Sequence, residues 1–149
     1  MFFWDKHKTI TTCCELLSSK VCDEYGLTQM QYDILMFLHN NPQHNTAADI
    51  VKVRKSTKSH VSTSLKGLED RGLIKRLQSA ENKKHIEIIL LEKAMPIIED
   101  GIKAQKDFAS NVLSGLTNEE KQICMSVFDK ICRNADEYLK NNSEMENEK

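Results

Sequence analysis

The sequence contains few glycines and prolines, and it lacks the glycine-rich motifs that hold phosphates. Only 5 of its 149 residues are glycine and 2 are proline. No G-x-G-x-x-G, Walker or G-x-S-x-G sequence occurs, and the glycines fall within or at the ends of expected helices. These absences exclude the common nucleotide-binding and hydrolase motifs. We therefore expect that the protein is not an enzyme.

Long apolar runs and paired cysteines are also missing. No run approaches the ~18 apolar residues of a membrane span, and the apolar segment at residues 1–4 is too short for a signal peptide. The 5 cysteines include no C-x-x-C pair, and the 5 histidines show no close ligand spacing. We expect a cytoplasmic protein without membrane contact, disulfide framework, metal or cofactor.

The net charge of −1 hides a strong division of charge along the chain. Residues 46–85 carry ten Lys or Arg against four Asp or Glu, a difference of +6, so the rest of the chain carries −7. This division would attract a polyanion to one segment and repel it from the others. An ordinary solvated, charged face remains the alternative explanation.

The positive segment contains a helix with two distinct faces. Val61, Leu65 and Leu68 lie together on one side of a helix that starts with Ser56 as its predicted N-cap. Arg71 and Gly72 would end it, because glycine enters the left-handed region cheaply. The opposite face carries short hydrogen-bonding and basic side chains, namely Ser56, Ser59, His60, Thr63 and Lys66. Such side chains match base edges and phosphates in a major groove, so we predict a DNA recognition helix.

Helical periodicity and capping boxes predict three helices before this one. The first covers residues 5–24, with one apolar stripe formed by Ile10, Cys13, Cys14, Leu17 and Val21. Capping boxes at residues 28–31 and 46–49 open helices that extend to about Leu38 and Val53. In the former helix, the core candidates are Tyr32, Leu35, Phe37 and Leu38. The last helix and the recognition helix, joined by a tight basic turn, form a helix-turn-helix.

After Gly72 the pattern becomes that of a β-hairpin. Residues 73–77 and 86–91 are β-branched or leucine-rich, and the polar segment between them has the composition of a hairpin loop. A hairpin directly behind a recognition helix is a wing. Its loop carries Lys83 and Lys84, which would reach phosphates or a minor groove if the hairpin lies beside a duplex.

Two further helices are predicted, over residues 92–116 and from a third capping box at Thr117. The expected fold is mainly α with a small β-hairpin wing, a winged helix-turn-helix flanked by long dimerisation helices. Its predicted parts are an N-terminal dimerisation helix (1–27), the DNA-binding module (28–92), C-terminal dimerisation helices (93–140) and a disordered acidic tail (141–149). The flanking helices have more apolar surface than the module can cover, which predicts a homodimer.

Three segments together resemble the MarR family of winged helix-turn-helix transcriptional regulators. They are Ser59-His-Val-Ser62, Leu68-Glu-Asp-Arg-Gly-Leu-Ile-Lys-Arg76 and Ser79-Ala-Glu-Asn-Lys-Lys84. The resemblance implies a homodimer that binds a pseudo-palindromic, double-stranded DNA operator and is expected to act as a repressor. It also implies a small aromatic or phenolic effector, bound between the dimerisation helices and the winged module.

The resemblance also assigns site residues. Those expected to touch bases or phosphates are Ser56, Thr57, Lys58, Ser59, His60, Ser62, Thr63 and Lys66, with Arg76 at the wing base and Lys83 and Lys84 at its tip. Where the family wing often carries an Asp-x-Arg sequence, this chain has Asn82-Lys-Lys84. Lysine lacks the planar fork that enters a narrow minor groove, so we expect the wing to bind phosphate. A pairing of Arg76 within the wing would have to use Glu81.

Two alternatives from other functional classes stay open. The chain could be a winged-helix interaction module without specific DNA binding, although the positive charge of residues 46–85 argues against this. It could also be a redox-sensing regulator that uses a cysteine of the first helix, namely Cys13, Cys14 or Cys22.

Overall fold

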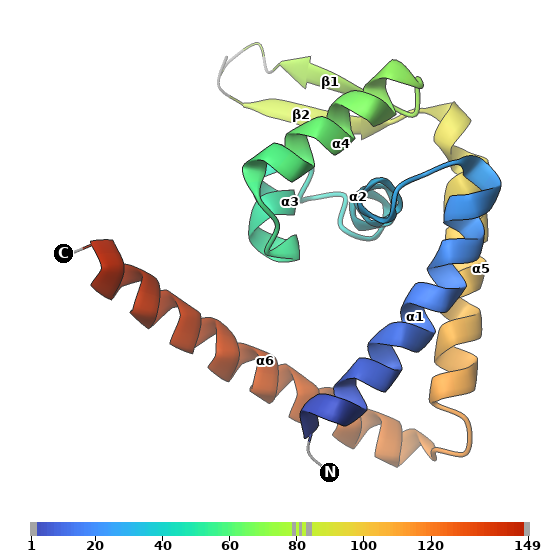
Figure 1. The fold of residues 1–149 in the computed structure, drawn as a ribbon, viewed down its shortest axis with the longest axis vertical. Helices are drawn as coiled ribbons and strands as arrows, with labels where there is room; N and C mark the ends of the chain where they lie inside the picture. The colour runs from blue at the N-terminus through green and yellow to red at the C-terminus, as the bar shows by residue number, and fades with distance from the viewer. Residues whose placement is uncertain (1–2, 79, 81, 83–84, 148–149) are drawn as a thin grey trace. The chain divides into compact units, whose positions relative to one another are not determined.

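The computed structural model of the protein describes residues 3–78, 80, 82 and 85–147 (Figure 1). Its elements are α1 (Phe3–Tyr25), α2 (Gln29–Asn40), α3 (Ala47–Arg54), α4 (Lys58–Asp70), β1 (Ile74–Gln78), β2 (Ile86–Leu90), a 3-10 turn η1 (Glu92–Ala94), α5 (Met95–Val112) and α6 (Asn118–Asn147). The predicted fold class is confirmed, because a helix-turn-helix is followed by a two-stranded antiparallel hairpin.

The chain divides into two units, residues 1–110 and residues 111–149. In the first unit, α4 lies beside the hairpin and α2 lies within the winged module (Figure 1). All four core candidates of α2 are buried, as predicted. The side chains with almost no exposure come from α2, α3, α4, β1 and α5, and they include Ile34, Leu35, Ile50, Leu65, Leu68, Ile74 and Ile98. The second unit consists mainly of α6.

The three predicted capping boxes are present. At α2, the Gln31 amide donates to Thr28 Oγ1 at 3.2 Å and the Thr28 amide donates to Gln31 Oε1 at 3.0 Å. Thr46 and Asp49 make the same reciprocal pair at α3, and Thr117 and Glu120 make it before α6. Each pair satisfies backbone donors that the helix itself cannot satisfy, so these helix starts follow from local sequence.

Removal of the Thr46 cap tests this local contribution. Thr46 Oγ1 also donates to Asp49 Oδ2 at 2.7 Å, and this bond holds the pKa of Asp49 below its usual value. We expect Thr46→Ala to lower the free energy of unfolding by about 1 kcal/mol in urea denaturation near pH 7. Ionised Asp49 contributes fully to the free energy of unfolding at pH values above the pKa of this carboxyl group in the unfolded chain. The contribution is lost as the pH falls through its lowered pKa in the folded protein. The exposed Thr12→Ala in α1 should cause no comparable loss; equal losses would contradict the cap.

The predicted N-cap of the recognition helix is wrong by one residue. Thr57, not Ser56, caps α4, since Thr57 Oγ1 accepts from the His60 amide at 3.2 Å. Lys55 follows α3 as its C-cap and takes the left-handed conformation, with φ of 51°. After this turn, the Ser56 hydroxyl donates a hydrogen bond to the Arg54 carbonyl at 3.3 Å. The cap position therefore depends on how the preceding helix ends.

The hairpin register pairs Ile74 with Leu90 and Gln78 with Ile86, so the strands match the predicted ranges to within one residue. The Ile88 amide donates to the Asn45 carbonyl at 2.7 Å, which fastens the segment before α3 to the edge of β2. This bond connects the wing directly to the helix-turn-helix.

Two predicted boundaries differ from the structure. The segment 92–116 begins with η1 and is α-helical only to Val112, because Gly115 takes a φ of 79° and turns the chain before Thr117. Residues 141–147, which were predicted to belong to a disordered tail, continue α6. Residues 148–149 lie outside the described residues.

None of the helices in the described part of the chain has the length and apolar character needed to cross a membrane.

Candidate nucleic-acid interface

The two predicted faces of α4 are present. Val61, Ser64, Leu65 and Leu68 are buried against the core. On the other side, exposed hydroxyl, imidazole and ammonium groups form a continuous polar surface, made by Lys58, Ser59, His60, Ser62, Thr63 and Lys66. Thr57 contributes its oxygen to the cap, and Ser56 is only half-exposed. This polar surface of α4 has the side chains that major-groove contacts require.

Several lysines add positive charge around the polar surface of α4. Lys52 at the end of α3, Lys58 and Lys66 on α4, and Lys75 on β1 are all exposed. Their ammonium groups make no hydrogen bond or ion pair with any other residue that the structure describes. No residue of the described part of the chain therefore neutralises these four lysines.

The arginines of the same module are engaged within the protein. Arg54 forms an ion pair with Asp33 of α2. Arg71 donates to the Tyr25 carbonyl at 2.6 Å and to the Gly26 carbonyl at 3.1 Å. These two side chains join the end of α3 to α2 and the end of α4 to the end of α1.

Arg76 connects the wing to the recognition helix. Its Nη2 and Nε donate to Glu69 Oε2 at 2.6 and 3.0 Å, and its backbone amide donates to Oε1 at 3.3 Å. Hydrogen bonds from Arg76 hold the pKa of Glu69 below its usual value. The partner of Arg76 thus lies on α4, a contact between two elements that sequence spacing did not predict.

The predicted contacts of Lys83 and Lys84, and the suggested partner Glu81, lie outside the described residues. Ser79 lies outside them as well. For the wing, the structure describes the two strands together with Ala80, Asn82 and His85.

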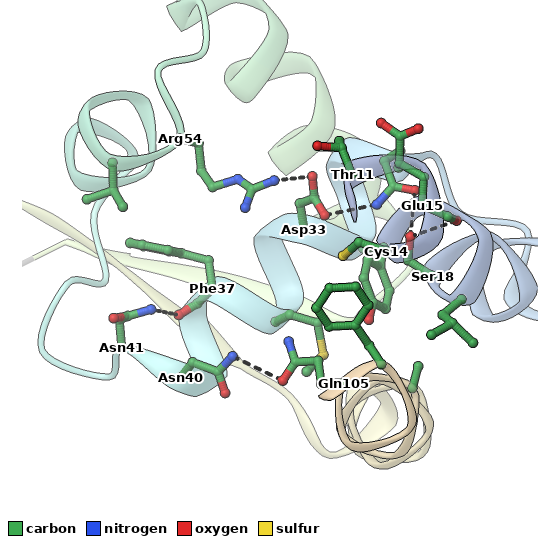
Figure 2. Close-up of a pocket in the computed structure, with 17 residues that line it drawn as sticks. Thr11, Cys14, Glu15, Ser18, Asp33, Phe37, Asn40, Asn41, Arg54 and Gln105 are labelled. Atoms are coloured by element: carbon green, nitrogen blue, oxygen red, sulfur yellow. Dashed lines mark hydrogen bonds and ion pairs between the residues drawn. The ribbon is translucent and has the colours of Figure 1, made fainter. Parts of the chain in front are cut away.

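A cavity of about 580 Å³ lies between α1, α2, the end of α3 and α5 (Figure 2). Its apolar walls include Met36, Phe37 and Phe108. Tyr32 also lines it, and burial, with a further contribution from the charge of Asp33, raises the pKa of that phenol to about 12. The phenol is therefore a neutral hydrogen-bonding group at physiological pH.

A polar chain follows one wall of this cavity (Figure 2). Ser18 Oγ donates to Gln29 Oε1 at 3.1 Å, and Gln29 Nε2 donates to Asp33 Oδ1 at 3.0 Å. Asp33 in turn holds Arg54, the last residue of α3. The cavity wall is thereby linked to the turn before α4. Sequence analysis missed these residues, because no local pattern pairs residue 33 with residue 54.

The surroundings of Cys14 and Cys22 disfavour the thiolate form of these two side chains. Burial, together with the charge of Asp33, raises the pKa of the Cys14 and Cys22 thiols above their usual value. A raised pKa reduces the thiolate fraction on which oxidation depends. The two thiols therefore do not support the redox alternative.

Comparison with known proteins agrees with this architecture. A Listeria monocytogenes MarR family transcriptional regulator in complex with a 26mer DNA is 23% identical, with a TM-score of 0.82 over 93% of each chain. The S. aureus MepR–DNA complex is 21% identical, with a TM-score of 0.77 over 90% of this chain and 96% of that one. The transcriptional regulator PA3341 is 23% identical, with a TM-score of 0.81 over 91% and 99%. The TM-scores show a shared fold.

The sequence of the module itself matches the model of a known family. Residues 25–85, which contain α2, α3, α4 and β1 and end just before β2, match the sequence model of the MarR family. This segment includes the resembling motifs, the polar surface of α4 and the three engaged arginines. Through this module, the chain is similar to the MarR family of transcriptional regulators.

Proposed function

We propose that the chain is a repressor that binds a pseudo-palindromic DNA operator as a homodimer, with α4 of each subunit in a major groove. The observation that supports this most directly is the polar surface of α4, exposed opposite a fully buried apolar face. In this proposal, Ser59, His60 and Thr63 meet base edges, and Lys58 and Lys66 meet phosphates. Two solved relatives of the same fold are described as DNA complexes.

The homodimer is supported by apolar side chains that one chain leaves exposed. On α6 these are Ile123, Met125, Val127, Phe128, Ile131, Tyr138 and Leu139, each at least 41% exposed. On α1, Ile10 and Leu16 are 50% and 62% exposed. Exposed apolar rows of this extent mark an interface, and a second copy would cover them symmetrically. Half-sites about one helical turn apart would then follow.

The wing is proposed as a phosphate-binding element. Lys83 and Lys84 at its tip would act as point charges on the duplex backbone, in the way that lysines bind phosphate. A repressor acts where chromosomal DNA lies, so the proposal includes a cytoplasmic location. It includes no catalytic step and no cofactor.

The cavity beside α2 is proposed as the effector site. Its volume of about 580 Å³ falls within the range usual for small-molecule sites, and its aromatic walls with a few polar groups suit an aromatic or phenolic compound. An occupant would touch Asp33, whose partner Arg54 ends α3 directly before the turn into α4. Occupancy would thus change the position of the recognition helix.

A cavity-filling variant tests the effector site. Ala104 lies on α5 and lines the cavity. We expect Ala104→Phe to retain operator binding within about threefold while it reduces by at least about tenfold the release of DNA by an aromatic effector found in a compound screen. The exposed neighbour Lys103→Phe should respond like the wild type. Unchanged release from the Ala104 variant would place the effector elsewhere.

Operator binding itself is tested by fluorescence anisotropy. The purified full chain is titrated against the duplex upstream of its own gene and against a scrambled duplex at ~150 mM salt, where specific binding is typically at least ~10³-fold tighter than non-specific binding. Such a preference supports the repressor. If a selection from random DNA also yields no preferred sequence, the interaction-module alternative replaces it.

A further inference from the structure

The arginine and lysine side chains of the winged module differ in their contacts. Residues 46–85 contain three arginines, at positions 54, 71 and 76, and seven lysines, at positions 52, 55, 58, 66, 75, 83 and 84. Every arginine is bound to another part of the protein, whereas Lys52, Lys58, Lys66 and Lys75 have no described partner. Arginine is the residue whose planar fork best fixes geometry, and lysine acts as a mobile point charge.

The arginine contacts join the elements that must be aligned if α4 and the wing are to touch the same DNA duplex. Arg54 ties α3 to α2, Arg71 ties the end of α4 to the end of α1, and Arg76 ties β1 to α4. The main chain of Arg71 is held in turn, because Lys93 Nζ donates to its carbonyl at 2.9 Å. Each contact joins two different elements. None of the three guanidinium groups belongs to the polar surface of α4.

We propose that Arg54, Arg71 and Arg76 are positioning residues that hold α4 and the wing in register, and that the DNA is contacted without arginine. This inference rests on the proposed function. It reassigns Arg76, which the family resemblance places among the DNA contacts. Phosphates are bound by lysines, and bases are selected by Ser59, His60 and Thr63.

The proposal limits how the operator can be recognised. The commonest specific contact in a major groove is an arginine fork on guanine, and the commonest shape contact is an arginine in a narrow minor groove. Hydroxyl and imidazole groups make single hydrogen bonds, and the threonine methyl group makes an apolar contact with thymine. Recognition therefore depends more on lysine electrostatics, and the preference for the operator should lie near the lower end of the usual range, about 10³- to 10⁴-fold.

The charge balance gives a direct test. Arg54 and Arg76 are neutralised by Asp33 and Glu69, so they add no net charge to the surface. Each lysine on a phosphate instead contributes about 0.9 to the slope of log K against log salt. The salt slope therefore separates a phosphate contact from a positioning residue.

The experiment compares Lys66→Gln, Arg76→Gln, Glu69→Gln and the Glu69→Gln/Arg76→Gln pair in the full-length protein. The probe is an operator duplex recovered from random DNA by selection, and anisotropy is measured between 50 and 200 mM salt. We expect Lys66→Gln to lower the slope by about 0.9. We expect both single variants of the ion pair, and the double variant, to weaken operator binding by the same roughly five- to tenfold factor with an unchanged slope.

A direct DNA contact by Arg76 predicts a different result. Arg76→Gln would then lower the slope by about 0.9, while Glu69→Gln would free the guanidinium and leave binding equal or tighter. Either observation overturns the proposal. The Glu69→Gln arm keeps the test valid if Arg76→Gln folds poorly. Failure of the wild type to prefer any selected duplex would instead refute the proposed function, so the two failures are distinguishable.

Discussion

Phe128→Glu is expected to convert the dimer into a monomer and to weaken operator binding by about 10²- to 10⁴-fold. Phe128 is 50% exposed on α6, within the apolar row proposed as part of the dimer interface. A carboxylate there would be buried without a partner in the dimer, so the interface would open. In a dimer, binding of one subunit to its half-site raises the effective concentration of the other subunit at the second half-site. Separate monomers lose this advantage, which accounts for the expected loss of affinity.

The measurement combines light scattering after size exclusion with anisotropy on the operator duplex. Ser126→Glu is the matched control, because Ser126 is exposed on the opposite side of the same helix and receives the same charge. It should remain dimeric and bind within about threefold of the wild type. A Phe128 variant that stays dimeric, or a monomer that binds as tightly as the wild type, would contradict the proposed assembly.

Leu65→Ala is expected to lower the free energy of unfolding by about 3 kcal/mol. Leu65 is 1% exposed and lies on the buried face of α4, within the core cluster that also contains Val61, Leu68, Ile50 and Ile88. Truncation removes buried methyl groups and leaves a cavity that surrounding side chains fill only in part. Because the same helix carries the polar surface, operator affinity should fall as well.

Urea denaturation followed by circular dichroism measures this loss. The adjacent Lys66→Ala provides the control, since Lys66 is exposed and its removal should change stability by at most about 0.5 kcal/mol. The two variants should therefore separate the faces of α4, with Leu65 affecting folding and Lys66 affecting the salt dependence of binding. A loss below about 1 kcal/mol for Leu65→Ala would contradict the assigned packing of this face.

The polar surface of α4 also depends on close helix packing. A Cβ at Gly67 would lie 2.6 Å from Gln31 Nε2, the amide end of the side chain that forms the capping box of α2. The absence of a side chain at this position lets α4 cross the start of α2. The buried face of the recognition helix is thereby fitted both to the core and to a neighbouring cap.

Local sequence determined the helix starts, the faces of α4 and the hairpin. Thr28, Thr46 and Thr117 cap helices through partners three residues away, so their roles follow from spacing alone. The buried Leu65 and the exposed Lys66 follow from helical periodicity, which is equally local. The family match over residues 25–85 covers the caps at Thr28 and Thr46, α4 and β1.

Tertiary structure decided the features that join distant residues. The partner of Arg54 is 21 residues away, and Arg71 reaches carbonyl groups 45 and 46 residues away. The cavity beside α2 takes its walls from four helices, and the α4 cap moved from Ser56 to Thr57 because of how α3 ends. Such contacts depend on helix placement, which the packing of the whole core determines, and no periodicity within one segment encodes it. The sequence by itself therefore determined which face of α4 is polar and exposed, and only the fold decided which cations of the module are held by partners within the protein.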